Sequence, residues 1–141
     1  MRPVEQPALV KAFVQHTLGC GCPETVFTSM LTEVFTPPDL PDVSIRRLLI
    51  GKRLLIYLLP SDGERSLPAG RLADIAGCAQ KERDSHGYNR VRLVVPSTRV
   101  EQDRVALARF FAERFGSDEK LHLHVLDRHH CPVITAAGND S

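Results

Sequence analysis

The apolar run Leu54-Leu55-Ile56-Tyr57-Leu58-Leu59 restricts the possible folds of this chain more than any other segment. Successive side chains of a strand point to opposite faces of a sheet, so an unbroken apolar run places apolar groups on both faces. Such a strand is stable only if other elements cover both of its faces. We therefore expect residues 53–59 to form a central strand of a sheet that is packed on both sides.

A hairpin precedes this central strand. Residues 44–50 form a second apolar run, and Gly51-Lys52 separates the two runs. Two-residue loops join antiparallel strands, and glycine accepts the positive φ at the first central position of a type II′ turn. The pattern predicts an antiparallel pair with such a turn. Upstream of it, residues 26–36 favour a strand preceded by a short helical turn.

Helical and strand patterns alternate in the second half of the chain. Apolar residues at helical spacing predict one helix that follows an N-cap at Ser66, and a second helix over residues 99–115 with Ser97 as its cap. Strands are expected at residues 90–95 and 120–126. Strands that alternate with helices form right-handed βαβ units in which the strands are parallel.

The remaining elements complete the predicted architecture. A first helix carries apolar residues from Leu9 to Leu18 and stops at Gly19, whereas residues 136–141 are expected to fray. The 141 residues suit a single domain, residues 1–141. We expect an α/β fold with a mixed sheet of about four to five strands, one hairpin and two βαβ units, and with helices packed on the sheet.

Charge and hydropathy limit the possible partners. The 18 Lys+Arg and 17 Asp+Glu residues leave a formal net charge of +1, which argues against nucleic acid as a partner. The first residues lack the apolar core of a secretory signal, and no apolar run is long enough to span a membrane, so we expect a cytoplasmic protein. The predicted hairpin carries four cations that suit an anionic ligand or a protein partner, or that protect a solvated sheet edge: Arg46, Arg47, Lys52 and Arg53.

Cys20 and Cys22 carry the strongest argument for chemistry among the four cysteines. They flank Gly21 and precede Pro23, so both sulfurs can reach one metal ion or lie close enough for redox exchange. With Cys22 as an N-cap and Pro23 at the first helical position, the Cys22 thiol would face the positive end of a helix, which lowers a thiol pKa. We expect Cys20 and Cys22 to be the catalytic residues.

A metal site needs about two ligands beyond such a pair. His16 lies shortly before Cys20, and a second cluster of ligand types follows the last predicted strand. Zinc and iron are the candidate metals. The sequence therefore predicts a metal site with the candidate ligands Cys20, Cys22, His129, His130 and Cys131.

Each of these features also has a structural interpretation. The cysteine pair can pack a tight turn, and His16 can complement the C-terminus of the first helix. Cys78 lies beside the apolar stripe of a helix and suits burial. His122 and His124 share one face of a strand, a spacing that either chelates a metal or marks the wet face of an edge strand.

A second candidate site lies where the predicted parallel strands end, because open α/β sheets bind ligands at this carboxyl edge. Ser97, Asp127 and His129 supply the residue types of a hydrolase, but the G-x-S-x-G turn is absent. No glycine-rich phosphate loop follows any strand. The polar residues delivered to this edge are Ser61, Asp62, Ser97, Thr98, Arg99 and residues 127–131.

The segment LGCGCPETVF, residues 18–27, followed by IGKRLLIY, residues 50–57, resembles a small family of short prokaryotic proteins without an established function. The resemblance extends over the first half of the chain. The resemblance indicates that the residues around Cys20 and Cys22 belong together as one motif. It implies no activity and no catalytic residue.

Two functions follow from these observations. The first is a thiol-dependent redox or metal-binding role through Cys20 and Cys22. The alternative is a non-enzymatic ligand-binding or protein-interaction module in which the cysteines are structural. Bound metal, or thiols that react faster than those of a model peptide, would distinguish the first function from the second.

Overall fold

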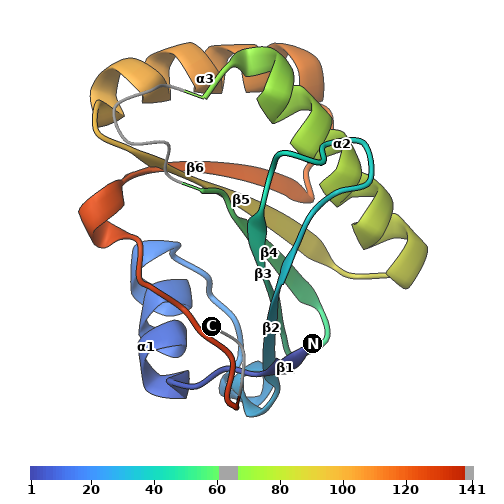
Figure 1. Ribbon diagram of the computed structural model, residues 1–141, viewed down its shortest axis with the longest axis vertical. Helices are drawn as coiled ribbons and strands as arrows, with labels where there is room; N and C mark the ends of the chain where they lie inside the picture. Colours follow the sequence, from blue (N-terminus) through green and yellow to red (C-terminus); the bar gives the residue numbers. More distant parts are fainter. Residues whose placement is uncertain (61–66, 139–141) are drawn as a thin grey trace.

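One mixed sheet contains all the strands of the computed structural model, which describes residues 1–60 and 67–138. Neighbouring strands follow one another in sequence, so the sheet order is β1-β2-β3-β4-β5-β6 (Figure 1). The pairs from β1 to β4 are antiparallel, whereas β4, β5 and β6 are parallel. The strands are β1 (Arg2–Pro3), β2 (Met30–Phe35), β3 (Ile45–Ile50), β4 (Leu54–Leu58), β5 (Arg90–Ser97) and β6 (Leu121–Asp127).

The predicted α/β class, the hairpin and both βαβ units are confirmed, but the sheet has 6 strands instead of four to five. The additional strand is β1, which pairs Arg2 with Thr32 and Pro3 with Leu31. Two residues are too short to display the alternation by which a strand is recognised. Pro3 is tolerated because its nitrogen points away from β2, so the bond from Val4 N to Met30 O, 3.0 Å, still joins the two strands.

Helices cover both faces of the sheet. The long helices α2 (Ala69–His86) and α3 (Val100–Phe115) lie on one face, and α1 (Pro7–Ala12), continued by a π-helical segment at Phe13–Thr17, lies on the other (Figure 1). The crossovers from β4 to β5 and from β5 to β6 advance in the same direction, so crossovers of the same hand place α2 and α3 on the same side. No helix in the described part of the chain is long and apolar enough to cross a membrane.

The core has two halves, one on each face of β4. Leu55 and Tyr57 point toward α2 and α3, whereas Leu54, Ile56 and Leu58 point toward α1. Every residue of β4 is buried. The prediction that this apolar run forms a central strand covered on both faces is therefore confirmed.

Helix α1 and the π-helical segment that continues it end at Gly19. Their apolar residues Val10, Phe13, Val14 and Leu18 pack on the sheet. The last turn is closed by hydrogen bonds from Leu18 N to Phe13 O and from Cys20 N to Val14 O, both 3.0 Å. Gly19 has a φ of 70°, a conformation that glycine adopts at little cost. The helix end predicted at Gly19 is confirmed.

The turn between β3 and β4 differs from the prediction. Gly51 and Lys52 both have positive φ, 61° and 59°, and Arg53 N donates to Ile50 O at 3.1 Å. These values define a type I′ turn, so the predicted type II′ turn is wrong. Type I′ also matches the right-handed twist of the strands, and it is adopted here although Lys52 must take the left-handed conformation.

The predicted caps have different outcomes. The prediction that Ser97 caps α3 is wrong, because the N-cap is Arg99 and no side chain caps the helix; the Ser97 hydroxyl instead accepts the N–H of Arg99 at 2.8 Å in the turn before it. Helix α2 extends through His86 and ends at Gly87, which has a φ of 70°. The predicted cap at Ser66 lies outside the described residues.

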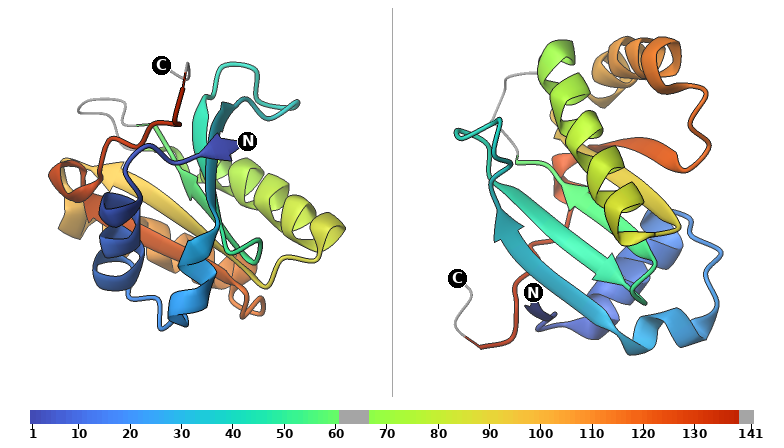
Figure 2. Two further views of the ribbon diagram at one scale, coloured as in Figure 1. Left: turned by 90° about the horizontal axis from the view of Figure 1, so that it is seen from below. Right: turned by 90° about the vertical axis from the view of Figure 1, so that its right-hand side faces the viewer.

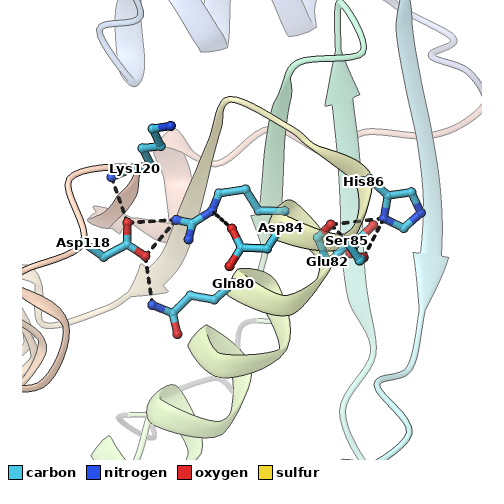
Figure 3. Close-up of polar contacts among 8 residues, drawn as sticks. Gln80, Glu82, Asp84, Ser85, His86, Asp118 and Lys120 are labelled. Atoms are coloured by element: carbon cyan, nitrogen blue, oxygen red, sulfur yellow. Dashed lines mark hydrogen bonds and ion pairs between the residues drawn. The ribbon is translucent and has the colours of Figure 1, made fainter.

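An ion pair ties α2 to the start of β6. Arg83 donates to both carboxylate oxygens of Asp118, at 2.8 and 2.9 Å, and also to Asp84. Gln80 and the backbone N–H of Lys120 donate to the same Asp118 carboxylate (Figure 3). Burial alone would raise the pKa of Asp118, but these donors hold it below its usual value. The loop between α3 and β6 is fixed to α2 by this cluster.

A second polar cluster lies between the sheet and α2. The Tyr57 hydroxyl donates to Glu82 at 2.5 Å, and Arg47 donates to the other Glu82 oxygen at 2.6 Å. Arg47 also pairs with Glu33, and its guanidinium lies 4.4 Å from the centre of the Phe35 ring. Strand β3 is thus an interior strand with a paired cation, and the interpretation of the basic hairpin as a solvated sheet edge is wrong.

The first residues of the chain lie beside residues 134–138. Val4 pairs with Ala136, Glu5 N donates to Thr135 O at 2.9 Å, and the views in Figure 2 show the two segments side by side. Ala136 is 1% exposed. The prediction that the chain frays from residue 136 is therefore wrong for residues 136–138, because backbone pairing with the N-terminal segment holds them.

Candidate functional site

The candidate site is a cavity of about 290 Å³ at the amino ends of β4 and β5. The loop between α1 and β2 forms one wall through Cys20, Gly21, Cys22 and Pro23. The other walls come from the β3–β4 turn and from the start of β5. The remaining lining residues are Val26, Ile50, Arg53, Leu54, Asn89, Arg90 and Arg92.

The Sγ atoms of Cys20 and Cys22 lie at disulfide distance, with their Cα atoms 5.3 Å apart. Both side chains are half-buried and pack against the core on the α1 face. The positive φ of Gly19 turns the chain out of the helix, and a Cβ at Gly21 would meet no atom within 4 Å. The local sequence therefore brings the two sulfurs together at the wall of the cavity.

The structure does not place Cys22 at a helix N-cap. The following helical segment is a single 3-10 turn at Glu24–Thr28, and Pro23 in extended conformation is its N-cap. One short turn has few aligned peptide dipoles, so the expected lowering of the thiol pKa by a helix end has no basis here. A proline after a cysteine fits an extended residue as well as it fits the first helical position, because its φ is the same in both.

The predicted metal ligands lie at two different ends of the sheet. His129 and His130 are exposed in a 3-10 turn that follows β6, and Cys131 lines a separate cavity of about 380 Å³ beside Pro96. Within residues 1–60 and 67–138, no group of three or more His, Cys, Asp or Glu side chains is placed to hold a metal ion. The structure thus brings Cys20 and Cys22 together, but it does not bring either of them to the His129–Cys131 cluster.

The other cysteines are less suited to thiol chemistry. Burial, followed by the nearby Asp127, raises the pKa of Cys131 to about 11, and its thiol donates to the Asp127 carbonyl oxygen at 3.7 Å. Cys78 lies 3.9 Å from the Tyr57 hydroxyl between α2 and the sheet. A thiol with a raised pKa is mostly protonated at neutral pH and is a poor nucleophile.

The carboxyl edge of the sheet has the predicted parallel order but not a hydrolase site. Ser97 and Asp127 are neighbours in register on β5 and β6. The Ser97 hydroxyl donates to Asp103 at 2.6 Å, and Asp127 accepts the backbone N–H of His129 at 2.9 Å. Both side chains therefore serve to shape the turns that follow the strands. Ser61 and Asp62 lie outside the described residues.

Three arginines converge on the cavity from two elements. Arg90 and Arg92 alternate with buried Val91 and Leu93 on β5, so both arginines lie on the α1 face of the sheet. Arg53 closes the β3–β4 turn and is exposed. No carboxylate in the described part of the chain forms an ion pair with any of the three.

Arg92 is the most confined of these cations. Its Nη1 donates to the Leu18 carbonyl oxygen at 3.3 Å and to His124 Nε2 at 2.9 Å, while its buried Nε has no hydrogen-bond partner. Burial lowers the pKa of Arg92, and the charge of Arg90 lowers it further. Arg92 is therefore a half-buried cation at the wall of the cavity, held in place by protein acceptors.

His122 and His124 act as acceptors for these arginines. Arg90 donates to His122 Nε2 at 3.0 Å, as Arg92 does to His124, and a guanidinium has no acceptor to offer in return. Burial, with the charge of Arg92 next, lowers the pKa of His124 to about 4 and also lowers that of His122. The two histidines are on the edge strand, as predicted, but they hold arginines in place.

Acid is expected to weaken the fold through His124. Because its pKa is lower in the folded chain than the ordinary 6.5, stability is full above about pH 6.5 and falls as the pH drops toward 4. With the partial exposure of the side chain taken into account, the loss is roughly 1 to 2 kcal/mol. The charged and titratable side chains near His124 are those of Arg92 and His122.

Urea unfolding at pH 7 and at pH 4.5 measures this effect. The variant His124→Gln keeps an acceptor for Arg92 but does not titrate, so it should lose less stability between the two pH values than the wild type. Equal losses in the two proteins would contradict the prediction.

The sequence analysis identified the cysteine pair and named Arg53 among four cations suited to an anionic ligand, but it missed Arg90 and Arg92. The available signal was the alternation of Arg90 and Arg92 with apolar residues, which places two cations on a face that the fold covers. Comparisons with protein-family models, with curated protein sequences and with solved structures found no match to the chain. The function is therefore inferred from the geometry of this cavity.

Proposed function

We propose that the chain exchanges electrons with thiols through the Cys20–Cys22 pair. One observation carries the proposal: two cysteines at disulfide distance line a cavity of about 290 Å³ that is large enough for a small molecule. A disulfide that only braces a fold usually joins distant segments, because its stabilisation grows with the length of the closed loop. A bond between cysteines two positions apart closes almost no loop, so structural bracing explains it poorly.

The charges around the pair support the same role. Arg53, Arg90 and Arg92 line the cavity with the cysteines, and nearby cations favour the thiolate form that attacks and leaves in disulfide exchange. Cys131 also lies at a cavity with two arginines, Arg46 and Arg128, but burial and Asp127 raise its pKa, and it has no second sulfur at disulfide distance. The pair therefore combines access to a ligand, proximity of the two sulfurs and a local field that stabilises the leaving thiolate.

The metal-binding alternative has less support. A zinc or iron ion at Cys20 and Cys22 would need about two more ligands, and among the described residues the only other uncharged polar side chain at the cavity is that of Asn89. The three arginines repel a cation. A binding module with inert cysteines is the second alternative, and thiol reactivity separates it from the redox proposal.

A redox titration of the purified protein tests the proposal. The protein is equilibrated with mixtures of reduced and oxidised dithiothreitol and then alkylated, and the alkylated cysteines are identified by mass spectrometry. We expect Cys20 and Cys22 to gain two alkyl groups together in one two-electron transition, whereas Cys78 and Cys131 follow no such transition.

The variants Cys20→Ser and Cys22→Ser are the matched controls, because each should leave its remaining thiol reduced across the titration in protein that keeps its fold. Elemental analysis of the same samples measures zinc and iron. Thiols of Cys20 and Cys22 that stay fully alkylated in the most oxidising mixture would contradict the redox proposal, and stoichiometric metal lost in both variants would favour the metal-binding alternative.

A further inference from the structure

The cavity beside Cys20 and Cys22 is lined by cations that have no anionic partner within residues 1–60 and 67–138. Its walls include Arg53, Arg90 and Arg92, and no acidic side chain of the described residues lines it. Most other buried or half-buried cations of this chain are paired, as Arg47 is with Glu33 and Glu82 and Arg83 is with Asp118. Three unneutralised charges around one cavity, in a chain of net charge +1, mark a local concentration of positive potential.

The position of Arg92 indicates that this potential serves a ligand. A desolvated cation without a counter-ion is costly, and the cost is offset when an anion enters the same low-dielectric space. Arg92 lines the cavity, and its Nη1 donates to the Leu18 carbonyl oxygen and to His124. The guanidinium is therefore fixed in place before a ligand arrives, which lowers the entropy that binding costs.

We propose that Arg53, Arg90 and Arg92 bind the anionic group of a small thiol, and that this thiol exchanges with the Cys20–Cys22 disulfide in the same cavity. The inference rests on the proposed redox function and names its substrate class. A volume of about 290 Å³ is at the lower end of ligand cavities, so the thiol is small. A carboxylate, sulfonate or phosphate group satisfies the arginines equally well.

The exchange balances in two steps. The thiolate of the first small molecule attacks one sulfur of the Cys20–Cys22 bond, forms a mixed disulfide with it and releases the other sulfur as a thiolate. The thiolate of a second molecule attacks the small-molecule sulfur of that mixed disulfide and releases the remaining cysteine thiolate. Two small thiols are oxidised to one small disulfide, the protein disulfide is reduced, and the two cysteines take up the two protons that the small thiols lost.

Three thiols of similar size test the charge preference: 2-mercaptoethanesulfonate, 2-mercaptoethanol and cysteamine, which are anionic, neutral and cationic. The rate at which each reduces the oxidised protein is followed by alkylation and mass spectrometry. Each thiol is compared with itself across variants, so differences in intrinsic reactivity cancel. The attacking thiolates carry charges of about −2, −1 and 0, so we expect Arg53→Gln/Arg90→Gln to slow the anionic thiol about tenfold, the neutral thiol several-fold less and the cationic thiol least.

Matched controls separate this site from general charge effects. Lys52→Gln removes a cation next to Arg53 that does not line the cavity, and Arg128→Gln removes one at the separate cavity beside Cys131. Neither should change the rate with the anionic thiol by more than about twofold, because both side chains are exposed to solvent and neither lines the cavity. Arg53 and Arg90 are both exposed, so their replacement spares the fold even where a change at Arg92 would not.

A competition assay supplies a second readout. Ethanesulfonate, which has the anionic group but no thiol, should slow reduction by 2-mercaptoethanesulfonate in the wild type and not in Arg53→Gln/Arg90→Gln. If the arginine variants reduce all three thiol rates alike, or none of them, this inference is overturned while the redox proposal stands. A wild-type disulfide that none of the three thiols reduces would overturn both.

Discussion

Replacing Gly51 with alanine is expected to lower the free energy of unfolding by about 3 kcal/mol. An added Cβ would lie 2.7 Å from Val26 Cβ and 2.8 Å from Val26 O, closer than such atoms approach, and the second contact is with backbone. The φ of 61° at Gly51 adds a further penalty of about 1 kcal/mol for any residue with a Cβ. Because Val26 lines the cavity, the same substitution should also slow thiol exchange. Urea unfolding measures the first effect.

Two other positions separate the clash from the backbone strain. Gly19 also has a positive φ, 70°, but an added Cβ there meets nothing within 4 Å, so Gly19→Ala should cost only about 1 kcal/mol. Lys52 has a φ of 59°, and Lys52→Gly should leave stability unchanged or raise it by up to about 1 kcal/mol. If Gly51→Ala costs no more than Gly19→Ala, the close approach of the β3–β4 turn to Val26 is not important for stability.

Replacing Glu82 with alanine is expected to cost about 3 kcal/mol, because it breaks a buried polar cluster from one side. Glu82 accepts from Tyr57 at 2.5 Å and from Arg47 at 2.6 Å, and its side chain is only 11% exposed. Without it, the Tyr57 hydroxyl loses its carboxylate acceptor inside the core. Burial, with Glu82 adding to it, raises the pKa of Tyr57, so the phenol stays protonated and remains a donor that needs an acceptor.

Variants of the same helix and of the partner provide the controls. Asp74→Ala removes an exposed carboxylate of α2 and should change stability by less than about 0.5 kcal/mol. Tyr57→Phe removes the buried donor together with its need for an acceptor, so it should cost less than Glu82→Ala. A double-mutant cycle between the two measures their coupling. Additive losses would show that Tyr57 and Glu82 do not stabilise each other.

Local patterns explain why most of the fold could be predicted. The run Leu54–Leu59 required cover on both faces, and Gly19 and Gly87 lie where helices end. These are properties of neighbours in sequence. Strand β1 was not predicted because its two residues have no strand pattern of their own. They form a strand only because they pair with Thr32 and Leu31, about thirty positions away in the sequence.

The candidate site was predictable only where it is local. The spacing of Cys20 and Cys22 was enough to place their sulfurs together, because Gly21 alone separates them. The proposed link to His129, His130 and Cys131 depended on a distance between segments, and the structure places those residues at the other end of the sheet. Arg53 and Arg90 are brought together by the pairing of β4 with β5, which no local pattern encodes.

The sequential order of the strands keeps each pairing step of folding local. Each strand pairs with the one before it, so every addition to the sheet closes a loop no longer than one hairpin or one crossover, and the associated entropy loss stays small. The pairing of Val4 with Ala136 is the exception, because it joins segments separated by almost the whole chain. During synthesis, Val4 can pair with Ala136 only after Ala136 has left the ribosome. Ile134 belongs to the same half of the core as Cys20 and Cys22 and is synthesised just before Ala136. The core on the α1 face, against which the cysteines pack, is therefore the last part of the core to be completed.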